Sequence, residues 1–354
     1  MQHIYKDSII QGSDWMRRIF ILLCLLMVWT ESALAAGNLG VLWDWQAPGE
    51  KESWLVQREK LPGIDVLSPS WFIIENAQGK IKTRHGSVKY VRQAHNKGYQ
   101  VWALITNNFD PQMTSKLLDS PMARKRVIAQ MEKLAKDYEL DGFNLDFENI
   151  NPADKDKLTD FVQEISKALK PQGLIISIDV TIPSNSGYWS KCYDRKAIAE
   201  VVDYMMLMAY DEHGASSEVS GSVASLPWVE DGIQKTLQEG VPEKKLILGM
   251  PLYMRTWQET KGKVKAKTLS MAQADKVIRE KGLVPVWLPK EGQYYFEYQE
   301  KNTRYRVWQE NRRSLALKAS LVNRYNLAGG AYWRSTLETD DVWPALAETL
   351  SYGK

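Results

Sequence analysis

The chain has 354 residues, 44% of them hydrophobic and 25% charged, which is enough apolar content for one large core or two modest ones. Its 46 Lys and Arg against 43 Asp and Glu leave a net charge of +3, and no block of like charge marks a polyanion-binding arm. Composition therefore argues against a disordered chain and against a nucleic-acid-binding protein.

The start of the chain resembles a targeting segment. Two arginines precede an apolar run at residues 19–29, and the small-x-small sequence Ala-Leu-Ala-Ala follows at 33–36. The run is shorter than the roughly 20 apolar residues that span a bilayer. We predict that residues 1–35 are a signal peptide and that the protein is secreted or associated with the cell envelope. A retained membrane anchor is the alternative, because the segment before the run is long and contains two aspartates.

Short β-branched or aromatic runs alternate with helical segments from residue 38 onward, a pattern typical of repeated βα units around a parallel sheet. Eight parallel strands with covering helices predict an α/β fold, a (β/α)₈ TIM barrel that occupies most of residues 36–354. The expected strands are Leu39–Trp43, Ile64–Ile74, Tyr99–Ile105, Gly142–Glu148, Leu174–Thr181, Tyr204–Tyr210, Lys245–Pro251 and Gly330–Trp333.

Two helices are expected on either side of the fourth strand. Ser120-Pro121 and Asn151-Pro152 each combine an N-cap residue with Pro at the first helical position. Each start is followed by an apolar stripe of helical period. The stripes are Val127, Ile128, Met131, Leu134, Ala135 and Tyr138 in the first helix, and Leu158, Phe161, Val162, Ile165 and Leu169 in the second.

The connection between the seventh and eighth strands is too long for a simple βα loop. It contains a Lys-rich stretch and an alternating aromatic stretch, QYYFEYQEKNTRYRVWQE, which predicts an antiparallel hairpin with Lys301-Asn302 near its turn. We predict a small α+β insertion at about residues 255–309, on the loop face of the barrel.

The fourth strand carries the clearest candidate chemistry. In LDGFNLDFENI, Asn144, Asp146 and Glu148 occupy alternate positions and therefore share one face, while Phe143, Leu145 and Phe147 share the other. If the apolar face packs on helices, the polar face points into the barrel, with Glu148 at the carboxyl end where barrel enzymes place their active sites. Buried carboxyl groups are costly unless they are paired and used. A purely structural polar cluster is the alternative interpretation.

Four segments together resemble glycoside hydrolase family 18. DGFNLDFE at 141–148 is similar to the family's Asp-Gly-x-Asp-x-Asp-x-Glu, with Asn144 in place of the first Asp of the Asp-x-Asp pair. MAYD at 208–211, GMPLYMR at 249–255 and GAYW at 330–333 resemble its motifs on strands six, seven and eight, in the same order. Within the family, the sequence is most similar to the bacterial branch that acts on peptidoglycan, particularly that of the spore cortex.

The resemblance implies a retaining hydrolase in which the 2-acetamido group of the sugar acts as nucleophile. Glu148 is then the general acid and base, and Asp146 orients the acetamide and stabilises the developing positive charge. Tyr210, aided by Asp211, holds the acetamide oxygen, and Trp333 forms an apolar floor. For Asn144, which cannot ionise, we expect an amide N–H that donates to Asp146 and keeps that carboxylate charged.

Further residues at strand ends are candidates for substrate binding. Trp43 and Trp333 are the expected walls of sugar subsites. Tyr253 and Arg255 follow strand seven and are expected to bind substrate hydroxyls or a carboxylate, although Arg255 could equally be a structural ion-pair partner. The four histidines lack ligand spacing and no nucleotide fingerprint is present, so we expect neither a metal nor a cofactor.

Three functions remain open at this stage. The favoured one is a secreted, monomeric β-N-acetylglucosaminidase whose substrate is the N-acetylglucosamine-containing glycan of peptidoglycan. The alternatives are a chitinase that acts on chitin oligomers and a carbohydrate-binding protein that lacks turnover. The presence of Glu148, Asp146 and Tyr210 together favours an enzyme.

Overall fold

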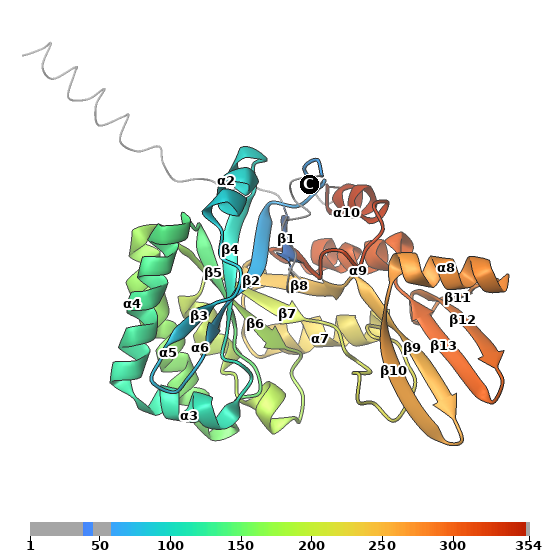
Figure 1. Cartoon of the computed structure of the whole chain (residues 1–354), viewed down its shortest axis with the longest axis horizontal. Helices are drawn as coiled ribbons and strands as arrows, with labels where there is room; N and C mark the ends of the chain where they lie inside the picture. The colour runs from blue at the N-terminus through green and yellow to red at the C-terminus, as the bar shows by residue number, and fades with distance from the viewer. Residues whose placement is uncertain (1–37, 45–57, 352–354) are drawn as a thin grey trace, which may run out of the picture. The chain divides into compact units, whose positions relative to one another are not determined.

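A computed structural model describes residues 38–44 and 58–351, so the predicted signal segment at 1–35 lies outside the described residues. Eight parallel strands form a closed barrel in which the first strand pairs with both the second and the last (Figure 1). The predicted (β/α)₈ barrel is confirmed. Its strands are β1 (Leu39–Asp44), β2 (Val66–Ile74), β4 (Gln100–Thr106), β5 (Gly142–Asp146), β6 (Ile175–Thr181), β7 (Tyr204–Met208), β8 (Leu246–Pro251) and β14 (Gly329–Trp333). The short β3 (Ile81–Thr83) pairs antiparallel with β2.

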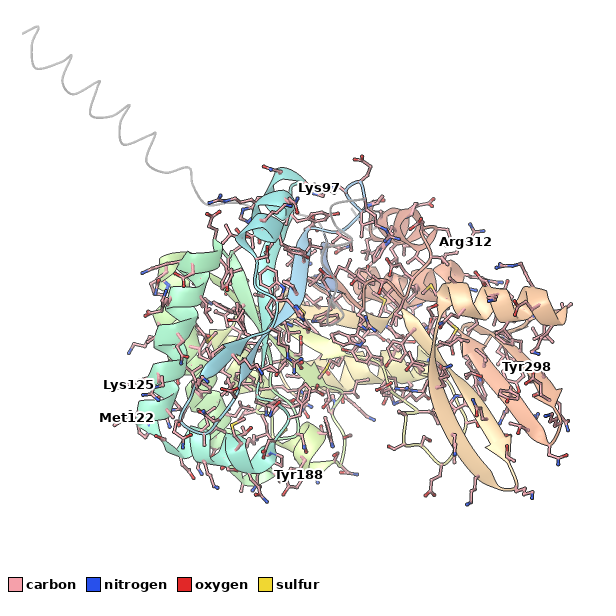
Figure 2. The ribbon with its side chains drawn as sticks, in the orientation of Figure 1. Lys97, Met122, Lys125, Tyr188, Tyr298 and Arg312 are labelled. Atoms are coloured by element: carbon pink, nitrogen blue, oxygen red, sulfur yellow. The ribbon has the colours of Figure 1, made fainter. Side chains whose placement is uncertain are left out.

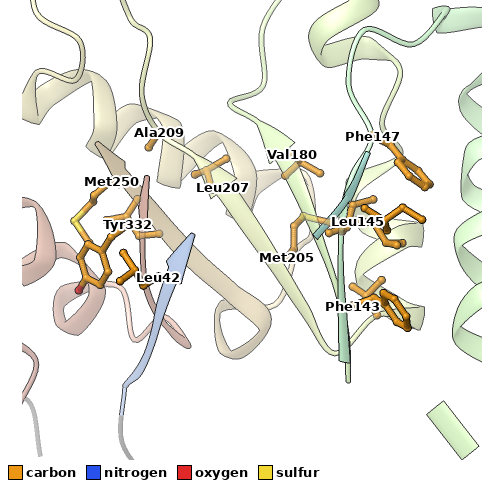
Figure 3. Packing of buried hydrophobic residues seen from close by; sticks show 14 of the residues in the cluster. Leu42, Phe143, Leu145, Phe147, Val180, Met205, Leu207, Ala209, Met250 and Tyr332 are labelled. Carbon is orange, nitrogen blue, oxygen red and sulfur yellow. The ribbon is translucent and has the colours of Figure 1, made fainter. Parts of the chain in front are cut away.

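Side chains alternate between the two faces of the barrel wall, as a period of two requires. The inward positions form one apolar cluster that includes Val41, Trp43, Trp102 and Met206. The outward positions belong to the larger core between the strands and the helices. Figure 3 shows Phe143, Leu145 and Phe147 projecting from the same side of β5 into that core. The predicted division of the fourth strand into two faces is therefore correct.

Helices cover the outside of the barrel. The predicted start of one of them is confirmed, because Ser120 accepts a hydrogen bond from the Ala123 amide and Pro121 opens the helix. In Figure 2, Met122 and Lys125 point away from the barrel on the outer side of that helix. The helices are α2 (Val88–Asn96), α3 (Pro111–Asp119), α4 (Pro121–Tyr138), α5 (Lys155–Leu169), α6 (Arg195–Val201), α7 (Leu226–Gln238), α9 (Arg312–Arg324) and α10 (Val342–Ser351). Short helical turns are η2 (Pro152–Asp154), η3 (Lys170–Gln172), η4 (Gly187–Lys191) and η5 (Glu243–Lys245).

Helix α5 shows how the apolar stripes hold this outer layer. All five residues of its predicted stripe are fully buried. The ring of Phe161 stacks on that of Phe147, with centroids 6.1 Å apart. The signal at Asn151-Pro152 starts the 3₁₀ turn η2, and α5 itself begins at Lys155. This packing fixes the outer face of β5 and so determines which residues face the barrel interior.

The predicted insertion lies between β8 and β14 as a five-stranded antiparallel sheet with one helix. Its elements are β9 (Tyr253–Thr260), β10 (Lys263–Ser270), α8 (Met271–Lys281), β11 (Val286–Leu288), β12 (Gln293–Glu300) and β13 (Thr303–Gln309). The hairpin around Lys301-Asn302 is confirmed by the pairing of β12 with β13. The Lys-rich stretch is a second hairpin, which turns at Lys261 and Gly262, both with positive φ. In Figure 1 the sheet extends to one side of the barrel.

Two barrel strands end earlier than the sequence predicts. Strand β5 ends at Asp146 and β7 at Met208, two residues short of Glu148 and Tyr210 respectively. Both missing positions belong to loops at the carboxyl ends of the strands. Among the described residues, no helix has the length and apolar character that crossing a membrane would require.

Candidate active site

The inward residues of β5 lie at the base of a cavity at the carboxyl ends of the barrel strands. Asn144 is fully buried and Asp146 is 7% exposed, while Glu148 follows the strand and is partly exposed. The cavity has a volume of about 400 Å³. It is lined by Ser70, Phe72, Ile73, Arg84, Thr106, Asn108, Phe109, Asp146, Glu148, Asp179, Met208, Tyr210, Asp211, Tyr253 and Trp333.

The backbone around Glu148 is held by side chains from other elements because the strand has already ended. The amide of Asn107, which follows β4, donates to the carbonyl oxygen of Glu148 at 2.8 Å and accepts from its N–H at 3.1 Å. The hydroxyl of Tyr193 donates to the carbonyl of Phe147 at 2.7 Å. Asn107 thus makes the two backbone hydrogen bonds that a neighbouring strand would otherwise make, and these bonds direct the Glu148 side chain into the cavity.

The environment of Glu148 suits a group that must gain and lose a proton near neutrality. Burial raises the pKa of Glu148 from 4.5 to about 7. A hydrogen bond with Asp146 opposes this rise in pKa, and the negative charge of Asp211 adds to it. A carboxylic acid with such a pKa is about half protonated at neutral pH and can therefore act as a general acid.

Asp146 lies between two other acids. Its pKa is raised well above the ordinary value, first by burial and then by the negative charges of Glu148 and Asp179. One of its carboxyl oxygens, Oδ1, is buried without a hydrogen-bond partner. An unpaired buried acceptor beside a cavity is available to a ligand N–H.

Asn144 does not donate to Asp146, so that part of the sequence prediction is wrong. Its Nδ2 donates to Oδ2 of Asp179 on β6 at 2.8 Å, and its Oδ1 accepts from Ser177 Oγ at 2.8 Å. The reason is geometric. Residues i and i+2 of a strand lie roughly 6.5 Å apart along the chain, whereas neighbouring strands are only about 4.8 Å apart. The amide therefore reaches sideways to the next strand.

Asp179 is a site residue that the sequence prediction missed. It is 2% exposed, lines the cavity and faces the barrel interior. A signal was present in IISIDVT, where Ser177 and Asp179 alternate with apolar residues as Asn144 and Asp146 do in β5. Burial raises the pKa of Asp179 well above its ordinary value, and the hydrogen bond from Asn144 opposes that rise.

Tyr210 and Tyr253 form the opposite side of the cavity together with Asp211. Burial raises the pKa of the Tyr210 hydroxyl well above its ordinary range, so this group keeps its proton and can donate a hydrogen bond. Asp211 Oδ1 accepts from the Tyr253 hydroxyl at 2.5 Å and from Arg255 Nη2 at 2.6 Å. The predicted residues Tyr210, Asp211 and Tyr253 all line the cavity.

Arg255 is not among the cavity-lining residues and is 6% exposed. Its guanidinium lies behind Asp211 and forms an ion pair with it. Arg255 is therefore a structural ion-pair partner, which was the alternative interpretation, and it does not make the expected direct contact with substrate. It holds Asp211 at the rim.

Trp333 lines the cavity at the end of β14, as predicted, but Trp43 does not. Trp43 is fully buried inside the barrel, with its ring 5.9 Å from that of Trp333 and 6.4 Å from that of Tyr210. The prediction of Trp43 as a subsite wall is wrong, because its side chain is fully buried and does not line the cavity. Its edge-to-face contacts support the rings of Tyr210 and Trp333.

The arrangement combines a carboxylic acid with a pKa of about 7, a second acid with a free oxygen, a phenol donor and a partly exposed indole in one cavity. These groups can protonate a leaving oxygen, hold an amide and bind the apolar face of a ring. Among residues 38–44 and 58–351, no group of three His, Cys, Asp or Glu side chains is arranged to hold a metal ion.

Comparisons with known proteins agree with this geometry. The sequence profile described as "Glycosyl hydrolases family 18" matches residues 43–338. An uncharacterized glycosylase of Bacillus subtilis, YvbX, is 30% identical over 270 residues, which cover 73% of this chain and 77% of that protein. A cortical fragment-lytic enzyme of Bacillus subtilis is 29% identical over 262 residues, or 71% of this chain and 60% of the relative.

Among solved structures, the C-terminal domain of a putative chitinase from Desulfitobacterium hafniense superposes with a TM-score of 0.80. The alignment covers 89% of this chain and 99% of that domain, at 24% identity. At this identity, the similarity supports the barrel fold alone.

Proposed function

Because the chain belongs to family 18 of the glycosyl hydrolases, we propose that this glycosidase cleaves β-1,4-linked N-acetylglucosamine glycans with retention, using the acetamide group of the substrate as nucleophile. One observation carries the proposal. Burial raises the pKa of Glu148 to about 7, and Glu148 lines one cavity together with Asp146, Tyr210 and Trp333.

In the first step, Glu148 donates its proton to the glycosidic oxygen while the acetamide carbonyl oxygen attacks the anomeric carbon. The bond between the anomeric carbon and the leaving oxygen breaks, and a cyclic oxazolinium ion forms. Asp146 accepts a hydrogen bond from the acetamide N–H and balances the positive charge. Tyr210 donates to the acetamide group, and Trp333 lies beneath the sugar.

In the second step, the ionised Glu148 removes a proton from a water molecule. The water oxygen attacks the anomeric carbon, and the acetamide carbonyl leaves it. Two inversions at the same carbon give overall retention, and Glu148 regains the proton that it lost in the first step. The free oxygen of Asp146 serves the acetamide in both steps.

We further propose that the substrate is peptidoglycan. The name of one relative, a cortical fragment-lytic enzyme, supports this choice. So does Arg84, an exposed cation that lines the cavity and forms no ion pair with any residue in the described part of the chain. Peptidoglycan carries carboxylates on its stem peptides, whereas chitin is neutral, so a cation at the rim favours peptidoglycan. The signal-like sequence at residues 1–35 fits a substrate outside the cytoplasm.

Product analysis tests the proposal. The purified protein and its Glu148→Gln variant are incubated side by side with spore cortex, vegetative cell wall and chitin oligomers, and products are identified by mass spectrometry. We expect new reducing ends at N-acetylglucosamine in the peptidoglycan samples and none with Glu148→Gln. Equal turnover by the variant would reject Glu148 as the acid. Preferred cleavage of chitin would reject the substrate assignment, and binding without turnover on every glycan would favour a carbohydrate-binding protein.

A further inference from the structure

Asp179 belongs to the cavity, yet the two steps described above do not use it. One of its carboxyl oxygens, Oδ2, accepts the hydrogen bond from Asn144. The other, Oδ1, is buried and has no hydrogen-bond partner. The indole N–H of Trp43 lies near the carboxyl group and lowers its pKa, although it falls short of a regular hydrogen bond. A buried carboxyl oxygen without a partner calls for a functional explanation.

The strand register places Asp179 beside Asp146. Asn144 pairs with Ser177 and Leu145 pairs with Ile178, so the next positions along the two strands are Asp146 and Asp179. Both side chains point into the barrel, and adjacent parallel strands lie only about 4.8 Å apart. The negative charge of Asp179 raises the pKa of Asp146, in agreement with this proximity. Asp146 Oδ1 is also buried without a partner.

The amide of Asn144 determines how Asp179 can act. Because an N–H occupies Oδ2, a proton carried by Asp179 is best placed on Oδ1, the oxygen left free. Ser177 fixes the orientation of the amide by donating to its carbonyl oxygen. Through these contacts, Ser177 and Asn144 leave Oδ1 of Asp179 as the one oxygen that can take a proton. This oxygen belongs to the inward face of the barrel wall, which Asp179 shares with Asp146.

We propose that Asp179 is a positioning residue that shares a proton with Asp146, so that Asp146 can carry negative charge while Glu148 keeps the proton for the leaving group. The inference rests on the proposed function. No net proton transfer is needed: the proton moves between Oδ1 of Asp179 and the carboxylate of Asp146, and the Glu148 proton alone reaches the substrate. Strand β5 has an amide, Asn144, where a second inward-pointing acid could stand. Asp179 on the neighbouring strand β6 supplies that acid instead.

The charged surroundings of Asp179 are limited. Asp146 faces it from β5, Glu148 from the loop after β5, and Tyr210 from the loop after β7. Tyr210 keeps its proton over the working range of pH because burial raises its pKa. The charge of Asp211 raises the pKa of Glu148, and the charges of Glu148 and Asp146 raise the pKa of Tyr193. The carboxyls of Asp146, Asp179 and Glu148 are therefore the groups whose titration the variants below will change.

Two variants test the inference: Asp179→Asn, and a double variant that exchanges the amide of Asn144 on β5 with the acid of Asp179 on β6. Asp179→Asn removes the shared proton, and we expect kcat to fall by about tenfold or more with KM within about twofold of the parent. The acid limb of the pH profile of kcat/KM should move to lower pH, because the charge of Asp179 that raises the pKa of Asp146 is lost. The double variant Asn144→Asp/Asp179→Asn rebuilds the amide–carboxyl pair in reverse, and we expect it to recover most of the lost kcat and the parent profile.

Asp156→Asn is the matched control, because it makes the same acid-to-amide change at an exposed position of α5 that does not line the cavity. Its pH profile should keep the midpoints of the parent. Asp179→Asn with a kcat and an acid limb like those of the parent would overturn the inference. A folded double variant that is no more active than Asp179→Asn would also overturn the inference. If Asp179→Asn does not fold, the activity of the double variant relative to the parent decides the matter.

A measurement without turnover separates this inference from the proposed function. Burial raises the pKa of Asp179 in the folded protein, so the parent loses stability as pH rises above 3.8, and Asp179→Asn should not show that loss. We expect the urea midpoint of Asp179→Asn to rise relative to that of the parent between pH 4 and pH 8. If no glycan is cleaved but this divergence is found, the proposed function fails and the raised protonation of Asp179 stands. If the urea midpoints of the parent and Asp179→Asn change with pH in parallel, the inference is overturned regardless of activity.

Discussion

Replacement of Glu148 by Gln should stabilise the folded protein at neutral and alkaline pH. The folded state binds the Glu148 proton more tightly than the unfolded chain does, with a pKa of about 7 against 4.5. The free energy of unfolding of the parent therefore falls as pH rises through this interval, and the loss is complete above pH 7. Each unit of pKa difference corresponds to about 1.4 kcal/mol, so the loss amounts to ~3 kcal/mol.

Glu148→Gln cannot ionise and escapes this loss. It also removes a negative charge that raises the pKa of Asp146, an effect of the same sign. Urea unfolding followed by tryptophan fluorescence at pH 4 and pH 8.5 measures the difference. We expect the free energy of unfolding of the variant, relative to the parent, to increase by ~3 kcal/mol between the two pH values.

Glu243→Gln makes the same chemical change at an exposed position and is the matched control. The free energy of unfolding of Glu243→Gln should change with pH as that of the parent does. If Glu148→Gln also follows the parent to within ~0.5 kcal/mol at both pH values, Glu148 does not carry a raised pKa in the folded state. The assignment of this residue as a neutral acid would then be wrong.

Three further substitutions test individual contacts. Tyr210→Phe removes the donor to the acetamide group, and we expect kcat to fall by about 10²-fold in a steady-state assay, with a loss below about threefold contradicting its role. Arg84→Ala should raise KM for peptidoglycan fragments by up to about fivefold and leave KM for chitin oligomers unchanged; equal effects on both would reject charge recognition. Asn107→Ala removes both bonds to the backbone of Glu148, and we expect a lower kcat together with ~1–3 kcal/mol lower stability in urea; unchanged kcat would show that the loop holds Glu148 without it.

The barrel was predictable because the alternation of apolar runs and helical stripes is a property of local sequence. All eight strands appear in the predicted order, and the two faces of β5 follow directly from its period of two. The residues Asp146, Glu148, Tyr210 and Trp333 came from motifs near the carboxyl ends of strands, where the geometry of a parallel barrel gathers them.

Contacts between strands were not predictable from one sequence. The side to which Asn144 points depends on its own strand alone, but its partner depends on the register of β5 against β6. For this reason the bond from Asn144 to Asp179 was missed and a bond to Asp146 was expected instead. Asp179 carried a recognisable signal, a lone acid in an apolar strand, but no local pattern connects it to β5.

Depth within the barrel was the second source of error. Trp43 and Trp333 both lie near strand ends, yet Trp43 is fully buried whereas Trp333 lines the cavity. Exposure of an inward aromatic residue depends on which side chains from other strands lie above it. The early end of β5 has a similar cause, because the side chain of Asn107 takes over the backbone hydrogen bonds that a longer strand would make.

The central claim is that Glu148 delivers a proton to a sugar that provides its own nucleophile. The most direct test compares N-acetylglucosamine oligomers with the same oligomers after complete removal of their acetyl groups, at matched length and concentration. The account predicts measurable hydrolysis of the acetylated series and a loss of turnover on the amine series by about 10³-fold or more. Equal rates on both series would contradict it, because the second series has no acetamide to attack the anomeric carbon.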